Sequence, residues 1–112
     1  MSAGMSSREG SVRFAVCLSV TRRGGWRDWG AISGAFERRL AAQASETVAA
    51  PHIESESRRG RDYVRITISV TIVAPDVAQA LAAAWRAFRK AAGDDTAGWD
   101  MAGAAAEVRP EP

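Results

Sequence analysis

Residues Tyr63–Val73 read YVRITISVTIV, and their side chains alternate between two kinds. Every second residue from Val64 to Ile72 is apolar and β-branched, whereas most residues between them carry a hydroxyl or a charge. Alternation of period two with β-branched residues on one side is typical of a half-buried strand. The stretch therefore predicts a sheet with one apolar face that other elements cover and one polar face that stays open.

Three further segments are expected to complete this sheet. Ser11–Thr21 (SVRFAVCLSVT) alternates in the same way and places Phe14 on the apolar side. Thr47–Ser57 leads into Arg58–Arg61, a turn-like cluster that would join it to the central strand as a hairpin. Trp99–Arg109 is expected to be the last strand, although its alanines leave a helix open as the alternative.

Two amphipathic helices are predicted between the strands. The first is expected to run from an Asp28 cap to about Ser45. The second begins at an Asp76 cap and ends at Gly93. The apolar stripe of the first helix consists of Trp29, Ile32, Phe36 and Leu40, and that of the second of Val77, Leu81, Ala84, Trp85 and Phe88.

The order strand, helix, strand, strand, helix, strand is that of the ferredoxin-like split βαβ fold (βαββαβ), an α+β architecture. Right-handed crossovers would place both helices on one face of a four-stranded antiparallel sheet, with strand order 4-1-3-2. We expect one domain over residues 11–109, a disordered N-terminal tail over residues 1–10 and a short C-terminal tail over residues 110–112.

Composition excludes several classes of function. The 112 residues carry a formal net charge of +2 and one cysteine, Cys17, which excludes an internal disulfide and a cysteine-rich metal site. The only histidine, His52, has no second ligand at metal spacing, so we expect neither a metal nor a cofactor. Met1–Gly10 lacks an apolar run of signal length, and no stretch approaches a membrane span. We therefore expect a cytoplasmic protein without membrane contact.

The open face of the sheet is where we expect a ligand or partner to bind. His52 is the one catalytic candidate, as a general acid or base oriented by Glu54. We favour the alternative that Glu54 and Arg65 form an ordinary cross-strand ion pair beside an exposed histidine. The binding residues predicted for this face are Arg13, Tyr63, Arg65 and Trp99.

Two loop clusters of arginine raise the question of nucleic acid. They comprise Arg22, Arg23 and Arg27 after the first strand, and Arg58, Arg59 and Arg61 in the hairpin. The second cluster opens a segment that resembles the central-strand motif of the RNA-recognition module, which shares the ferredoxin-like fold. The likeness is carried by Arg59, Gly60, Tyr63 and Val64, and the segment departs from the motif at Arg61, Asp62 and Ile66. This resemblance implies RNA stacked on the open face, but Phe14 faces the core and leaves the first strand without a stacking aromatic.

Three functions follow from these patterns, in order of preference. The first is a small non-catalytic binding or regulatory module that forms a homodimer through its open sheet face or binds another protein. The second is a cofactor-free dimeric ferredoxin-like enzyme of the monooxygenase or isomerase type, with a small ligand in a pocket between sheet and helices. The third, which we favour least, is a nucleic-acid-binding module that uses the arginine loops.

Overall fold

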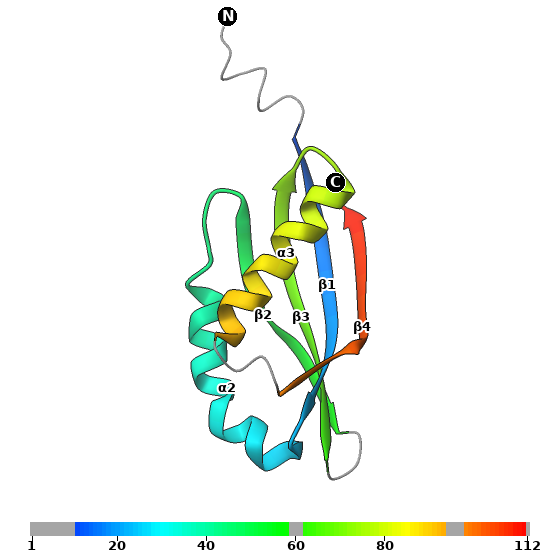
Figure 1. Ribbon diagram of the computed structural model, residues 1–112. Helices are drawn as coiled ribbons and strands as arrows, with labels where there is room; N and C mark the ends of the chain where they lie inside the picture. The colour runs from blue at the N-terminus through cyan, green and yellow to red at the C-terminus, as the bar shows by residue number, and fades with distance from the viewer. Residues whose placement is uncertain (1–10, 59–61, 94–97, 112) are drawn as a thin grey trace, which may run out of the picture.

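The computed structural model describes residues 11–58, 62–93 and 98–111, and these form the expected α+β fold (Figure 1). The elements are β1 (Val12–Arg23), α2 (Gly25–Ala41), β2 (Val48–Arg58), β3 (Tyr63–Ala74), α3 (Val77–Ala92) and β4 (Trp99–Pro110). The strands make one antiparallel sheet in the order β2-β3-β1-β4, and both helices cover the same face. The ferredoxin-like fold is thereby confirmed, and the last segment is a strand rather than a helix.

The ends of the chain differ from the predicted tails at one point. Pro110 belongs to β4, and the backbone N–H of Glu111 donates to the carbonyl of Arg13 over 2.8 Å. The C-terminal boundary of the packed unit thus lies beyond Arg109. The predicted N-terminal tail, residues 1–10, lies outside the described residues.

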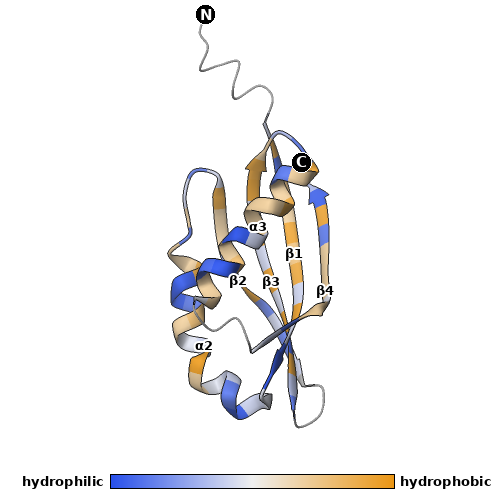
Figure 2. Ribbon diagram, viewed as in Figure 1, coloured by the Kyte–Doolittle hydropathy of each residue, from blue (hydrophilic) through white to orange (hydrophobic). Residues whose placement is uncertain are grey.

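The ladder between β1 and β3 is the centre of the sheet. It pairs every residue from Val12 opposite Ala74 to Arg23 opposite Tyr63 without a break in register. Apolar and more polar residues alternate along the middle of both strands, as the sequence predicted (Figure 2). Buried and half-buried residues alternate there too, from Phe14 to Val20 in β1 and from Val64 to Ala74 in β3. Because period two sends one set of side chains to each face, one face of this ladder is apolar and needs a cover.

The helices provide that cover. In α2 the predicted stripe faces the core, since Trp29, Phe36 and Leu40 are fully buried and Ile32 is partly buried against them. The helix begins earlier than the predicted Asp28 cap, because Gly24 adopts a left-handed conformation (φ 95°) that turns the chain directly from β1 into the helix. Asp76 caps α3 as expected by accepting from the Gln79 N–H over 2.8 Å. None of the helices in the described part of the chain is long and apolar enough to cross a membrane.

The buried side of α3 differs from the predicted stripe. Val77 is half exposed, and Leu81 and Trp85 are only partly buried. A row of small residues faces the sheet instead, and small side chains let the helix axis approach closely. The residues of α3 that are buried are Ala80, Ala84, Ala87, Phe88, Ala91 and Ala92.

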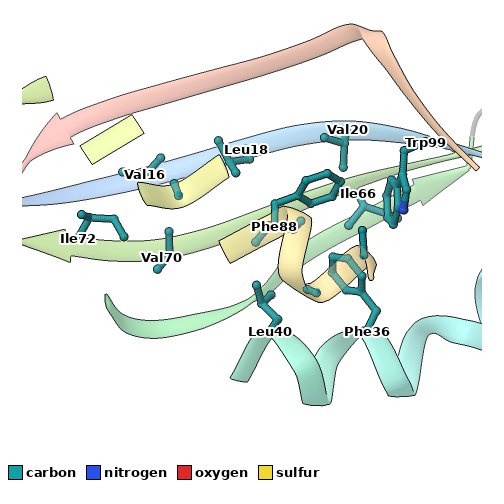
Figure 3. Packing of buried hydrophobic residues seen from close by; sticks show 14 of the residues in the cluster. Val16, Leu18, Val20, Phe36, Leu40, Ile66, Val70, Ile72, Phe88 and Trp99 are labelled. Atoms are coloured by element: carbon teal, nitrogen blue, oxygen red, sulfur yellow. The ribbon is translucent and has the colours of Figure 1, made fainter. Parts of the chain in front are cut away.

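An aromatic cluster fills one end of the core, and Trp99 is part of it (Figure 3). Its ring lies 5.0 Å from Phe88, 5.3 Å from Phe36 and 5.8 Å from Trp29, measured between ring centroids. The prediction that Trp99 lies on the open face is therefore wrong. Trp99 pairs with Arg22, and both side chains lie on the helix-covered face, where the guanidinium stacks 5.1 Å from the indole ring.

The misplacement of Trp99 has a local cause, an irregularity in β4. Ser19 pairs with Ala105 and Thr21 with Asp100, so four residues of β4 lie opposite Val20 alone. The bulge inserts an odd number of extra residues, and this reverses which residues face the helices on its two sides. Simple alternation counted back from Val108 therefore assigns Trp99 to the wrong face.

The hairpin between β2 and β3 is confirmed, but its register is not the predicted one. Ile53 pairs with Ile68 rather than Ile66, and Arg65 pairs with Ser57 rather than Glu54. The difference begins at the hairpin, where Arg58 pairs with Val64 although Arg58–Arg61 was predicted to be the loop. Two irregularities in β2, between Ala49 and His52 and between Ile53 and Ser55, shift the pairing again along the strand. Such bulges break the period on which a sequence-based register depends.

The placement of Trp99 can be tested by truncation. We expect Trp99→Ala to lower the free energy of unfolding by about 3–5 kcal/mol, the usual cost of removing a large buried aromatic side chain. Trp26→Ala serves as the control, because Trp26 is 42% exposed and its loss should cost about 1 kcal/mol or less. Urea unfolding measures both values, and equal losses would contradict the core position of Trp99.

Candidate functional site

The open face of the sheet has a floor of small side chains. On β1 and β3 this face presents residues with a methyl, hydroxyl or thiol group, and they are only partly buried because no helix covers them. Ser19 and Thr67 lie opposite each other, with their hydroxyl oxygens 3.3 Å apart. The floor consists of Ala15, Cys17, Ser19, Thr67, Ser69 and Thr71.

Longer side chains from the two edge strands rise on both sides of this floor and make it a trough. One hollow of about 430 Å³ and an adjoining one of about 220 Å³ share Cys17, Glu54 and Arg109 in their walls. We call the combined depression the polar trough. Its β2 bank carries Glu54 and His52, and its β4 bank carries Glu107 and Arg109.

His52 is held against the floor of the polar trough. Its Nδ1 lies 2.7 Å from the carbonyl oxygen of Ala50, which can only accept, so Nδ1 carries the proton. In the neutral imidazole Nε2 is then an acceptor, and the Ser69 hydroxyl oxygen lies 3.1 Å from it. Ser69 Oγ is also 3.5 Å from Nδ1, so the hydroxyl approaches the ring obliquely rather than along the Nε2 lone pair.

A strained backbone sets this position of His52. Ala50 has φ 48°, the left-handed region that residues with a Cβ seldom adopt, and it lies within the irregularity between Ala49 and His52. The bulge turns the histidine toward Ser69, its partner across the ladder. The sequence offered one signal for Ser69, its place among the hydroxyls of the central strand, but none for the bulge.

Cys17 and Glu54 form the second polar contact in the trough. The thiol donates to Oε2 of Glu54 over 3.3 Å. Burial raises the pKa of the Cys17 thiol, and the hydrogen bond and negative charge of Glu54 raise it further. Cys17 is thus held as a neutral thiol, which is a poor nucleophile.

Charges of both signs border the trough. Arg109 lies 3.2 Å from Glu107 on the β4 bank, and Arg13 lies 3.8 Å from Glu111 at the end of the sheet. These pairs are exposed, and exposed ion pairs stabilise a fold by no more than about 1 kcal/mol. Among the described residues no three side chains are placed to hold a metal ion.

The residues predicted to form one binding site do not meet. Arg13 pairs with Val73 and Tyr63 pairs with Arg23, at opposite ends of the β1–β3 ladder. At roughly 3.3 Å per residue, about 33 Å separates Arg13 from Tyr63 along the strands. Arg65 stands near the Tyr63 end, whereas His52 pairs with Ser69 about 20 Å from Tyr63, so Tyr63 and Arg65 cannot fix a substrate beside His52.

Two further predicted groupings are separated or undescribed. His52 lies on the open face and Trp99 on the helix-covered face, so no single pocket contains both. Arg59 and Arg61 of the hairpin cluster lie outside the described residues, and of Arg58 only the backbone, the last residue of β2, is described. Glu107 and Arg109 also line the trough, but they were not among the predicted binding residues. Nothing in the sequence of the last strand indicates a partner for either side chain.

Comparison of the chain with protein-family models, with curated proteins and with solved structures finds no match. The case for function therefore depends on the geometry of the trough and of the surfaces around it.

The thiol environment can be tested by alkylation, since Cys17 is the only cysteine. Because burial and Glu54 both disfavour the thiolate, the rate of reaction with iodoacetamide should rise at higher pH in the folded protein than in the urea-unfolded chain. Glu54→Gln should move the folded profile toward lower pH, yet leave it above the unfolded one because burial persists. Identical profiles for folded and unfolded protein would contradict the contact.

Proposed function

We propose that this protein is a small non-catalytic binding or regulatory module that acts as a homodimer, with two polar troughs packed face to face. The observation that carries the proposal is the uncovered floor of small side chains between the charged banks. A second copy is the occupant that we propose, because it presents the same floor of small side chains between the same charged banks.

Sheet packing supports the pairing of two such faces. Stacked sheets lie about 10 Å apart, and small residues at the contact permit that spacing without large rearrangement. A chain of 112 residues buries a modest core, so burial of a whole sheet face would add to its stability. The hydroxyl oxygens of Ser19 and Thr67 are 3.3 Å apart, so each hydroxyl already has a hydrogen-bond partner within its own chain. Burial in such an interface would therefore leave neither hydroxyl unsatisfied.

The charged banks meet in one arrangement of the two copies. A two-fold axis parallel to the strands sets β2 of one copy over β4 of the other. Each β2 bank then lies against the partner's β4 bank, and the same contact recurs on the other side of the axis. The paired charges of Glu107 and Arg109 on β4 let this bank approach the bank that carries Glu54 and His52 without a net repulsion of like charges.

The other two functions receive less support. The contact between His52 and Ser69 is the one feature that favours the enzyme, but its oblique geometry and the position of Trp99 on the far face weigh against it. Nucleic-acid binding stays a prediction from the sequence. We include a cytoplasmic location in the proposal, and its support is the free thiol of Cys17.

Ala105→Arg tests the dimer. Ala105 is exposed on β4 and lines the trough, so a long charged side chain there should block face-to-face packing without harming the monomer. Light scattering at tens of micromolar should give the mass of two 11.9 kDa chains for the unaltered protein and of one for the variant. Ala31→Arg is the matched control, because Ala31 is exposed on α2, and this variant should remain dimeric. A monomeric unaltered protein would refute the proposal.

A further inference from the structure

A second hollow lies on the helix-covered side of the sheet, away from the polar trough. It opens between the C-terminal half of α3 and the start of β4 and has a volume of about 280 Å³. We call it the tryptophan groove. Its walls are Trp85, Phe88, Arg89, Ala92, Trp99 and Met101.

The walls of the groove are aromatic. Phe88 stands between the two indoles, 5.8 Å from Trp85 and 5.0 Å from Trp99, and it meets both rings nearly edge-on at 87° and 82°. Phe88 and Trp99 are almost fully buried, so the partly buried Trp85 presents the ring on which a further aromatic ring can stack. Met101 is 47% exposed at the rim, and its thioether adds a polarisable contact for such a ring.

The charge at the rim of the groove is positive. Among the described residues that line the groove, Arg89 is exposed and is the only charged one, and none carries a carboxylate. A guanidinium favours an anionic, planar acceptor such as a carboxylate.

We propose that the tryptophan groove binds a small aromatic carboxylate. The ring occupies the space between Trp85, Phe88 and Met101, and the carboxylate pairs with Arg89. The volume suits a ligand of one or two rings, since a cavity of about 150 Å³ suffices for benzene. The site is independent of the proposed dimer, because the groove and the trough lie on opposite faces of the sheet.

Nuclear magnetic resonance of the full chain tests the site directly. The protein has four tryptophans, and each indole N–H gives its own signal. Titration with naphthoate to millimolar concentration should shift the signals of Trp85 and Trp99. The signal of Trp26, which lies on α2 and does not line the groove, should stay in place. Naphthamide, the neutral analogue, should bind about fivefold more weakly, as befits the loss of one exposed ion pair.

Two variants test separately how the charge of Arg89 and the apolar rim of the groove contribute to binding. Arg89→Gln should lower the affinity for naphthoate to that for naphthamide and leave naphthamide binding unchanged. Met101→Glu places a carboxylate at the rim and should repel naphthoate. Val77→Glu is its control, since Val77 is equally exposed at the other end of α3 and this variant should bind normally.

Three results would overturn the proposal. One is an absence of shifts for Trp85 and Trp99 at millimolar naphthoate. Another is equal affinity of the unaltered protein for the acid and the amide. The third is an acid preference that survives Arg89→Gln. The monomeric Ala105→Arg variant should bind naphthoate as the unaltered protein does, so failure of the dimer and failure of the groove are distinguishable.

Discussion

The unbroken antiparallel ladder of β1 and β3 determines the rest of the molecule. Because both strands place β-branched residues on one face, that face must be covered, and in the described part of the chain the two helices cover it. The core, the aromatic cluster and the tryptophan groove all lie on the covered side. The trough lies on the other side, where the same alternation leaves hydroxyls and a thiol in contact with solvent.

The regular parts of the fold were predictable because their periods are regular. The strands, the helices, the strand order and the covered face follow from side chains that repeat every two or every three to four residues. The second helix shows a limit of this reasoning. Its alanines, rather than Val77 and Trp85, make the closest contact, because close packing of a helix on a sheet favours small residues over large ones.

The candidate site was far less predictable, and bulges are the main reason. The residues that line the trough come from four strands, two of which change register within the site. The bulge in β4 explains why alternation assigns Trp99 to the wrong face. The wrong pairing of Glu54 with Arg65 has another cause, because Arg58 belongs to the strand and not to the predicted loop. The left-handed conformation of Ala50, which turns His52 toward Ser69, leaves no mark in an alanine. Local backbone irregularity thus decides which side chains meet, and composition does not reveal it.

Because of the irregular segment between Asp100 and Ala105, β4 contributes side chains to both faces of the sheet in turn. The part before it contributes an indole to the aromatic layer, and the part after it contributes Glu107 and Arg109 to the solvent-facing bank. Deletion of one residue within this segment would exchange inside for outside along half the strand. Chain length there is consequently under tighter restraint than residue identity, and related chains should tolerate replacement at Ala102 or Gly103 far better than insertion or loss.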